Sequence, residues 1–430
     1  MAETETTAPA AGASARAGAP AAVDPAIAGP AGVPRFGEFV AMMAGLMALT
    51  ALSIDIMLPA LPRIGADFRA IGENAPQLVV TAYVLGFAAG QIVYGPLSDR
   101  YGRKPVLFVG LILYAAASFL CLVAGTFETL LAARALQGVA NAAPRVIAIA
   151  VVRDVYGGRR MAEVMSFVMM VFIIVPILAP TVGGGFLLVG SWHLIFAFLG
   201  VVAIAILAWV GLRLPETRPQ DLREPLSLAW LAGAFGTTIR TPQTLGYTLA
   251  TGGLFGCLMG YINSSEQIFT DIYGVGGWFP ILFGGVAAAL ALASFLNSRL
   301  VMRVGMRRLS HGALIGFVVT GLAHLAIRAV FGPPPLVVFV ALLALALFFF
   351  GIVMPNFNAL AMEPMGRIAG TASSFVGAMT TGLGATLGWY IGQHYDGTAA
   401  PLVAGFAACG TASLALALAT ERGRLFRATR

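Results

Sequence analysis

Gly95-Pro-Leu-Ser-Asp-Arg-Tyr-Gly-Arg-Lys104 is a short, charged stretch between two long apolar runs, and the expected fold follows from it. A connection of this length cannot cross a membrane, so it joins two antiparallel spans at one face. We expect its two glycines to let the backbone turn tightly or pack closely. Its cations place it on the cytoplasmic side. The residues expected to control conformation here are Gly95, Asp99, Arg100, Gly102, Arg103 and Lys104.

The composition predicts a membrane protein made of helices. Of 430 residues, 59% are hydrophobic and only 10% are charged, whereas a soluble domain carries about 25% charged residues. Apolar runs recur at the length of a membrane-spanning helix. The net charge of +7 lies in loops, so it indicates topology and not nucleic-acid binding. Because the cysteines and histidines are scattered, we expect no metal and no cofactor.

Twelve apolar segments predict an all-α fold of two pseudo-symmetric six-helix bundles. Residues 35–213 and 243–420 would form the halves, with 214–242 as a polar cytoplasmic linker. We expect residues 1–34 to be a disordered tail and 421–430 a basic one. The bias of cations toward alternate loops places both tails in the cytoplasm. The expected spans are 36–63, 76–97, 105–125, 128–152, 162–188, 191–213, 243–270, 277–300, 309–331, 335–361, 369–394 and 399–420.

A faint internal repeat relates the two halves. Asp55 near the end of the first span matches Glu266 near the end of the seventh, and a glycine follows each acid ten residues later. The turn at 299–308 resembles the turn at 95–104 but lacks its aspartate. Repeats of this kind are typical of secondary transporters.

Two charged residues within the spans suggest a functional site. A charge at the centre of a span costs about 2.5–3.5 kcal/mol on insertion scales. Asp55 in the first span and Arg134 in the fourth lie at similar depth, so we expect them to share a water-filled cavity, as a pair or through a third group. Burial favours the neutral form of a carboxyl group and a nearby arginine favours the charged form. Movement of Arg134 would then switch proton binding by Asp55, unless the two form only a static ion pair.

Further polar residues share this region. Arg145 follows Arg134 by eleven residues, almost three helical turns, and Asn141 lies nearby on the same face. With Asp55 and Glu266 they are the predicted substrate-binding residues. Arg145 could equally be a structural tie near the cytoplasmic gate, and Glu266 could simply reach the membrane interface.

The fifth span carries Pro176 and Pro180, followed by Gly183 and Gly184. Prolines four residues apart free backbone carbonyls and bend a helix, and glycines permit close helix contact. We expect this helix to act as a seal between the halves that opens and recloses. A kink without functional consequence is the alternative.

At these positions the chain resembles the major facilitator superfamily of secondary transporters. Residues 95–104 fit its loop signature, Arg134-Ala-Leu-Gln-Gly138 resembles its proton-linked signature, and Pro180 with the two glycines resembles its antiporter signature. More narrowly, Asp55-Ile-Met-Leu-Pro-Ala-Leu-Pro62 and Asp396-Gly-Thr-Ala-Ala-Pro401 are similar to the Bcr/CflA-type drug exporters. The resemblance implies twelve helices in the bacterial inner membrane and drug efflux in exchange for protons. It also implies that Asp99 caps or pairs with neighbouring helix ends.

We therefore predict a monomeric secondary transporter that exports small amphipathic drugs or toxic metabolites, coupled to protons, by alternating access. Its partners would be its substrate, protons and the lipid bilayer. The alternative is transport, including uptake, of an organic anion by Arg134 and Arg145, which the fifth-span pattern opposes. A membrane sensor or an intramembrane enzyme has no supporting group of residues, so we expect no enzyme.

Overall fold

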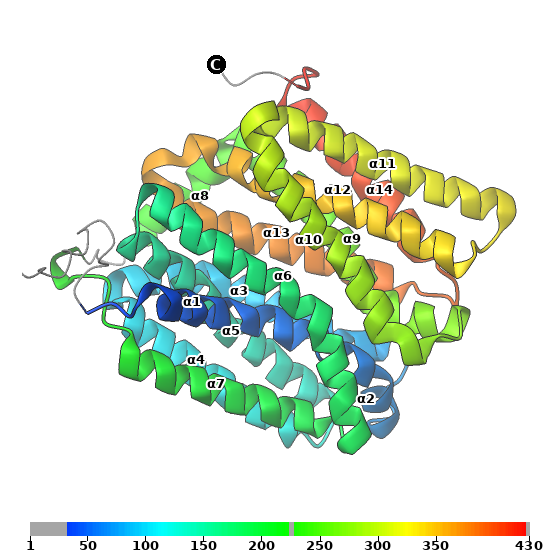
Figure 1. Ribbon diagram of the computed structural model, residues 1–430, viewed down its shortest axis with the longest axis horizontal. Coiled ribbons are helices and arrows are strands. Elements are labelled where there is room, and N and C mark those ends of the chain that lie inside the picture. Colours follow the sequence, from blue (N-terminus) through cyan, green and yellow to red (C-terminus); the bar gives the residue numbers. More distant parts are fainter. Residues whose placement is uncertain (1–31, 223–227, 427–430) are drawn as a thin grey trace, which may run out of the picture.

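The computed structural model describes residues 32–222 and 228–426, and the regular structure of these residues is helical. Most of the predicted N-terminal tail lies outside them. Figure 1 shows two groups of long helices side by side. The first group comprises α1 (Phe36–Asp55), α3 (Leu78–Tyr101), α4 (Arg103–Leu122), α5 (Phe127–Val155), α6 (Gly158–Val189) and α7 (His193–Arg213). The second comprises α9 (Pro242–Gln267), α10 (Phe279–Val304), α11 (Met306–Phe331), α12 (Leu336–Met362), α13 (Ala369–Gln393) and α14 (Ala400–Thr420).

The predicted all-α, two-bundle fold is confirmed. Within the described residues, 11 helical segments are long and apolar enough to cross a membrane. The twelfth long helix, α13, is rich in glycine and threonine. It packs between α9 of its own half and α3 of the other. A helix surrounded by protein does not need an apolar face toward lipid, which explains its composition.

The first predicted span is interrupted. We expected a helix over 36–63, but α1 ends at Asp55 and is followed by the short turn η1 (Leu58–Ala60) and the short helix α2 (Leu61–Asp67). Pro59 has no N–H to donate to the carbonyl of Asp55, four residues earlier. Asp55 therefore lies at the end of a helix instead of inside one.

The predicted polar linker also contains a helix. α8 (Leu228–Arg240) packs against α13 and α9, and the ring of Phe235 stacks on that of Phe375 at 4.8 Å between centroids. With 13 residues, α8 is too short to span a bilayer. The linker is thus fastened to the second half.

The turn between α3 and α4 is a single glycine. α3 continues through Gly95 to Tyr101, and only Gly102, with φ 98° and ψ 159°, separates it from α4. This conformation is essentially restricted to glycine. Gly305, between α10 and α11, has nearly the same angles, φ 86° and ψ 150°. The two turns that the sequence related therefore share one backbone geometry.

Of the two roles that we expected for these glycines, Gly102 provides the tight turn and Gly95 provides close packing. A Cβ atom at Gly95 would lie 2.6 Å from Oγ of Ser374 on α13. The contact joins the halves, because α3 and α13 form one of the two main helix pairs between them; α6 and α10 form the other. We call the end of the bundle that holds the α3–α4 turn the Gly102 end, and the opposite end the Asn74 end.

We predict that Gly102→Ala lowers the free energy of unfolding by about 1–3 kcal/mol, because alanine is strained at this φ and ψ. Gly305→Ala should behave alike. Thermal unfolding of the purified protein in detergent measures both. The control is Gly312→Ala in α11, where a Cβ atom meets nothing within 4 Å. Equal melting temperatures for all three variants would contradict the prediction.

Candidate functional site

Arg103 is the centre of an ionic cluster at the Gly102 end. Its side chain is 1% exposed. Nη1 lies 2.8 Å from Oδ1 of Asp99, and Nε lies 2.8 Å from Oδ2 of Asp154 at the foot of α5. Nη1 also donates to Oγ of Ser98. The guanidinium thus ties the end of α3, the start of α4 and the end of α5 together.

Glu216 completes this cluster from the start of the linker. Its two carboxylate oxygens accept hydrogen bonds from the backbone N–H groups of Arg103, at 2.8 Å, and Lys104, at 3.1 Å. These are the first residues of α4, where free N–H groups and the helix dipole favour an anion. The sequence reasoning did not single out Glu216. One feature of the sequence could have identified it: Glu216 comes just after the last helix of the first half, and Glu421 comes just after α14, the last helix of the second half.

The second half contains a matching cluster. Arg307 near the start of α11 contacts Glu363 at 2.8 Å and Glu421 at 2.9 Å. Glu363 follows α12 and corresponds to Asp154 at the end of α5 in the first half. Glu421 follows α14 and corresponds to Glu216, which comes after α7. Glu421 also accepts a hydrogen bond from Tyr247 of α9. The two halves are therefore held at the same end by equivalent ionic clusters.

The other charged residues of the 95–104 stretch have local partners. Asp99 contacts Arg103 and, at 3.8 Å, Arg218 of the linker. The capping role expected of an acid here is filled instead by Glu216. Arg100 is exposed and lies over the ring of Tyr101, and Lys104 donates to the carbonyl of Gly211.

Arg134 is fully enclosed within the first half. It is 0% exposed, and it donates to the carbonyls of Val79 and Ser53 and to the side chain of Gln137. Its guanidinium also lies over the ring of Tyr83, 4.5 Å from the centroid. Each of its three nitrogens donates to an uncharged oxygen of the protein. In this arrangement Arg134 ties α1, α3 and α5 together and is closed off from solvent.

The three polar residues that we placed on one face of the fourth span gather around Tyr83 of α3. Asn141 hydrogen-bonds to its hydroxyl, and both Arg134 and Arg145 interact with it electrostatically. Asn141 and Arg134 therefore lie against Tyr83 of α3, whereas Arg145 is partly exposed. Asn141 leaves its carbonyl oxygen buried and without a hydrogen-bond donor.

Of the two arrangements that we expected for Asp55 and Arg134, a direct pair or a link through a third group, the direct pair is absent among the residues that the structure describes. Asp55 is only 4% exposed, and no hydrogen bond or ion pair reaches its carboxylate from the residues that the structure describes. Arg134 is joined to the same helix through the Ser53 carbonyl, two residues away. Arg134 reaches a backbone carbonyl in the last turn of α1, where carbonyls lack an intrahelical partner, so its bond to this helix does not involve the Asp55 side chain.

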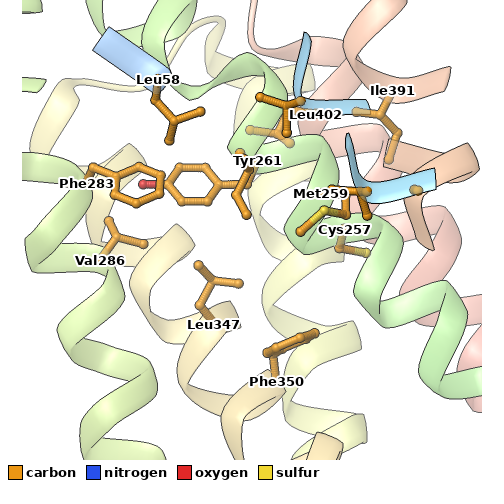
Figure 2. Packing of buried hydrophobic residues seen from close by; sticks show 14 of the residues in the cluster. Leu58, Cys257, Met259, Tyr261, Phe283, Val286, Leu347, Phe350, Ile391 and Leu402 are labelled. Atoms are coloured by element: carbon orange, nitrogen blue, oxygen red, sulfur yellow. The ribbon is translucent and has the colours of Figure 1, made fainter. Parts of the chain in front are cut away.

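Asp55 lies near the second half, because η1, which follows it, packs against α9. It lies within electrostatic range of Tyr261 on α9, whose hydroxyl is buried without a hydrogen-bond partner. Figure 2 shows Tyr261 stacked on Phe283 of α10, with Leu58 of η1 beside the pair. Sequence reasoning missed Tyr261, although it lies only five residues before Glu266. A buried acid and a buried hydroxyl that has no hydrogen-bond partner among the described residues thus lie near the junction of the halves.

The proline–glycine segment of α6 lies at the same junction. Gly183 packs directly on the backbone carbonyl of Ile56, just after Asp55, and Gly184 faces Pro280 of α10. Pro176 and Pro180 lie within α6, which continues as one helix through them. A side chain at position 183 would collide with the backbone of Ile56, so the close approach of α6 to the end of α1 requires a glycine at this position.

Glu266 lies apart from the other predicted substrate-binding residues. It lines a cleft of about 340 Å³ at the Asn74 end, between α9 and the segment around η2 (Ala75–Gln77). Hydrogen bonds join the halves beside the cleft: Asn74 donates to the carbonyls of Gln393 and Tyr395, and Gln77 donates to Gln267. The Asn74 end is therefore closed by neutral hydrogen bonds.

The sequence profile described as Major Facilitator Superfamily matches residues 43–389. An uncharacterized MFS-type transporter, YdgK of Bacillus subtilis (strain 168), is 32% identical over 371 residues, which cover 84% of this chain and 90% of that protein. A bicyclomycin resistance protein homolog of Haemophilus influenzae is 31% identical over 377 residues, which cover 86% and 93%. The crystal structure of the human organic anion transporter MFSD10 superposes with a TM-score of 0.67 at 19% identity, covering 90% of this chain and 99% of that one. At this level of identity, the similarity to MFSD10 shows a shared fold and nothing more.

We predict that Asp154→Asn lowers the free energy of unfolding by about 3 kcal/mol, because it leaves the buried Arg103 guanidinium with fewer counter-charges. The control is Glu163→Gln, which breaks an ion pair with Arg160. Both side chains of this pair are more than a third exposed, so the variant should change the free energy of unfolding by less than about 1 kcal/mol. Chemical unfolding in detergent measures both variants. Similar losses in the two would refute a special role for the buried cluster.

Proposed function

Because the chain belongs to the Major Facilitator Superfamily, a family of transporters and not of enzymes, we propose that it exports small amphipathic compounds in exchange for protons. The drug-resistance name of its Haemophilus influenzae relative supports efflux as the direction. We propose a location in the bacterial inner membrane, in keeping with its bacterial relatives, and function as a monomer. The polar linker and the two six-helix domains would be the units that move.

The distribution of cations supports a cytoplasmic position for the Gly102 end. By the positive-inside rule, the cation-rich end of a bundle faces the cytoplasm. Cations at the Asn74 end are Arg63, Arg69 and Arg328. Those at the Gly102 end include Arg35, Arg100, Arg103, Lys104, Arg153, Arg160, Arg213, Arg218, Arg240, Arg303, Arg307, Arg308, Arg422 and Arg424. Both termini are then cytoplasmic.

Asp55 carries the proposal for proton coupling. A buried carboxylate without a partner is far more costly than a neutral carboxylic acid. The closed junction around Asp55 and Tyr261 therefore favours the protonated acid, and loss of the proton favours a hydrated, open junction. Because α1 and α9 belong to different halves, proton binding at Asp55 acts on the contact that alternating access must break.

Arg134 has a supporting role in this proposal and not the switching role that the sequence suggested. Its donors are held by Ser53, Val79 and Gln137, so it fixes the helix that carries Asp55. The same geometry weighs against the alternative of an organic-anion site at Arg134. Arg145 is half-buried and lies toward Tyr83, which gives no independent support for such a site.

The α6–α10 contact would provide the seal. Gly284 of α10 packs on the carbonyl of Ile177, next to Pro176, and Gly184 packs on Pro280. Contacts between small residues and backbone rely on dispersion and not on ion pairs, so they can separate and re-form. Pro180 and Gly183 keep α6 close to the turn after Asp55.

We predict that Asp55→Asn abolishes proton-driven accumulation but not folding, because asparagine cannot exchange a proton. Accumulation is measured in proteoliposomes with an imposed pH gradient. The transported compound is fluorescent or radiolabelled and is chosen by a growth-inhibition panel that includes bicyclomycin. Glu128→Gln, which removes an exposed acid in the first turn of α5, should accumulate the compound like the wild type. A full compound gradient in the Asp55→Asn variant would exclude Asp55 as the coupling residue.

We predict that Asp99→Asn slows turnover several-fold with little change in KM. Arg103 would lose one of its two ionic partners, which weakens the end of α3 without touching substrate. Initial rates of export over a range of compound concentrations separate the two constants. The control is Asp221→Asn, which removes an exposed linker acid at the same end. An unchanged kcat for Asp99→Asn would argue against a conformational role for Asp99.

A further inference from the structure

The end of α13 receives hydrogen bonds from the other half of the molecule. α13 ends at Gln393, and the last carbonyl groups of a helix have no N–H partner within it. Nδ2 of Asn74, just before η2 in the first half, donates to the carbonyl of Gln393 at 3.1 Å and to that of Tyr395 at 2.9 Å. Helices commonly obtain such partners from the residues that follow them in the chain. Here the donor stands 319 residues from Gln393.

Further hydrogen bonds hold Asn74 against the second half. Its backbone carbonyl accepts from Nε2 of Gln393 at 2.8 Å, and its side-chain oxygen accepts from Nε2 of Gln267 at 3.1 Å. Gln267, the last residue of α9, also donates to the carbonyl of Glu73 and accepts from Gln77. Both polar atoms of the Asn74 side chain are thus paired with the second half.

The two halves approach closely here because α13 has a glycine in its last turn. A Cβ atom at Gly392 would collide with Oε1 of Gln77, and it would lie 3.0 Å from Cβ of Asn263. A larger residue at position 392 would therefore displace Gln77 from α13. The glycine and Asn74 serve the same contact, in which a loop of the first half closes over a helix end of the second.

The hydrogen bonds of this contact join uncharged groups. Those of Asn74, Gln77, Gln267 and Gln393 link amide and carbonyl groups of the two halves. Neutral hydrogen bonds are individually modest, and they separate without leaving a buried charge unpaired. The contact can therefore hold this end closed and still release it.

We propose that Asn74 is an interdomain helix cap, which couples the order of the last turn of α13 to closure of the Asn74 end. With the halves together, Asn74 satisfies the carbonyls of Gln393 and Tyr395. When the halves separate, these carbonyls lose their donor and the last turn of α13 frays. The inference deepens the proposed function and rests on its alternating access for the opening step, whereas the cap itself is independent of transport.

Hydrogen–deuterium exchange of the full-length protein in lipid nanodiscs tests the cap. Asn74→Asp keeps the size of the side chain but has no N–H group to donate. We expect the backbone amides of residues 389–396 to exchange at least about fivefold faster in this variant, because two hydrogen bonds to the helix end are lost. Asn74→Ala provides the same test should the aspartate variant fold poorly.

The control for exchange is Glu73→Ala. The Glu73 side chain is exposed, and its contact with Gln267 uses the backbone carbonyl, which alanine retains. This variant should exchange like the wild type. Wild-type exchange of residues 389–396 in both Asn74 variants would overturn the cap.

Thiol labelling tests the coupling to closure. Asn263 is 3% exposed and lies beside Gly392. With the three native cysteines replaced by serine, Asn263→Cys should react with a membrane-impermeant maleimide at least about fivefold faster once Asn74→Asp is added. Equal labelling rates with and without Asn74→Asp would overturn the coupling. Neither measurement uses a gradient or a transported compound, so a failure of proton-coupled export would leave both expectations unchanged.

Discussion

The buried guanidinium of Arg103 is the interaction on which the architecture depends. It is surrounded by Asp99, Asp154 and Ser98, while Glu216 holds the first N–H groups of α4 beside it. A buried charge that lost these partners would cost several kcal/mol, about 3–5 by analogy with broken buried pairs. The cluster therefore joins α3, α4 and α5 at the Gly102 end, together with the start of the linker, into one unit. Arg307 does the same for the second half through Glu363 and Glu421.

The contacts between the halves are of another kind. α3 meets α13 and α6 meets α10 through glycines, as at Gly95 and Gly284, and the Asn74 end is closed by amide hydrogen bonds. A neutral hydrogen bond contributes only about 0.5–1.5 kcal/mol net. Strong ionic ties within each half and weak, neutral contacts between them allow rigid halves to rock against each other. A transporter that alternates between two openings needs this difference in strength.

Asp55 lies where these two kinds of contact meet. Its helix is fixed to the first half by Arg134, which is satisfied by carbonyl and amide oxygens. Asp55 lies within electrostatic range of Tyr261 of the second half, whose hydroxyl has no hydrogen-bond partner among the described residues. In the proposed function, a single proton would change the stability of the junction while the half that carries it stays intact.

The sequence by itself determined the helices, their order and the family, because apolar length, loop charge and a short signature are local properties of the chain. It also placed Arg134, Asn141 and Arg145 on one helical face. Only the tertiary structure decided what those side chains touch: Arg134 binds carbonyls, Asp55 lies near Tyr261, and Glu216 caps α4 across more than a hundred residues of sequence. Depth in a membrane can be counted along a helix, but the partner of a side chain depends on how helices distant in sequence rotate and pack. That is why a direct Asp55–Arg134 pair was plausible in depth but is absent among the described residues.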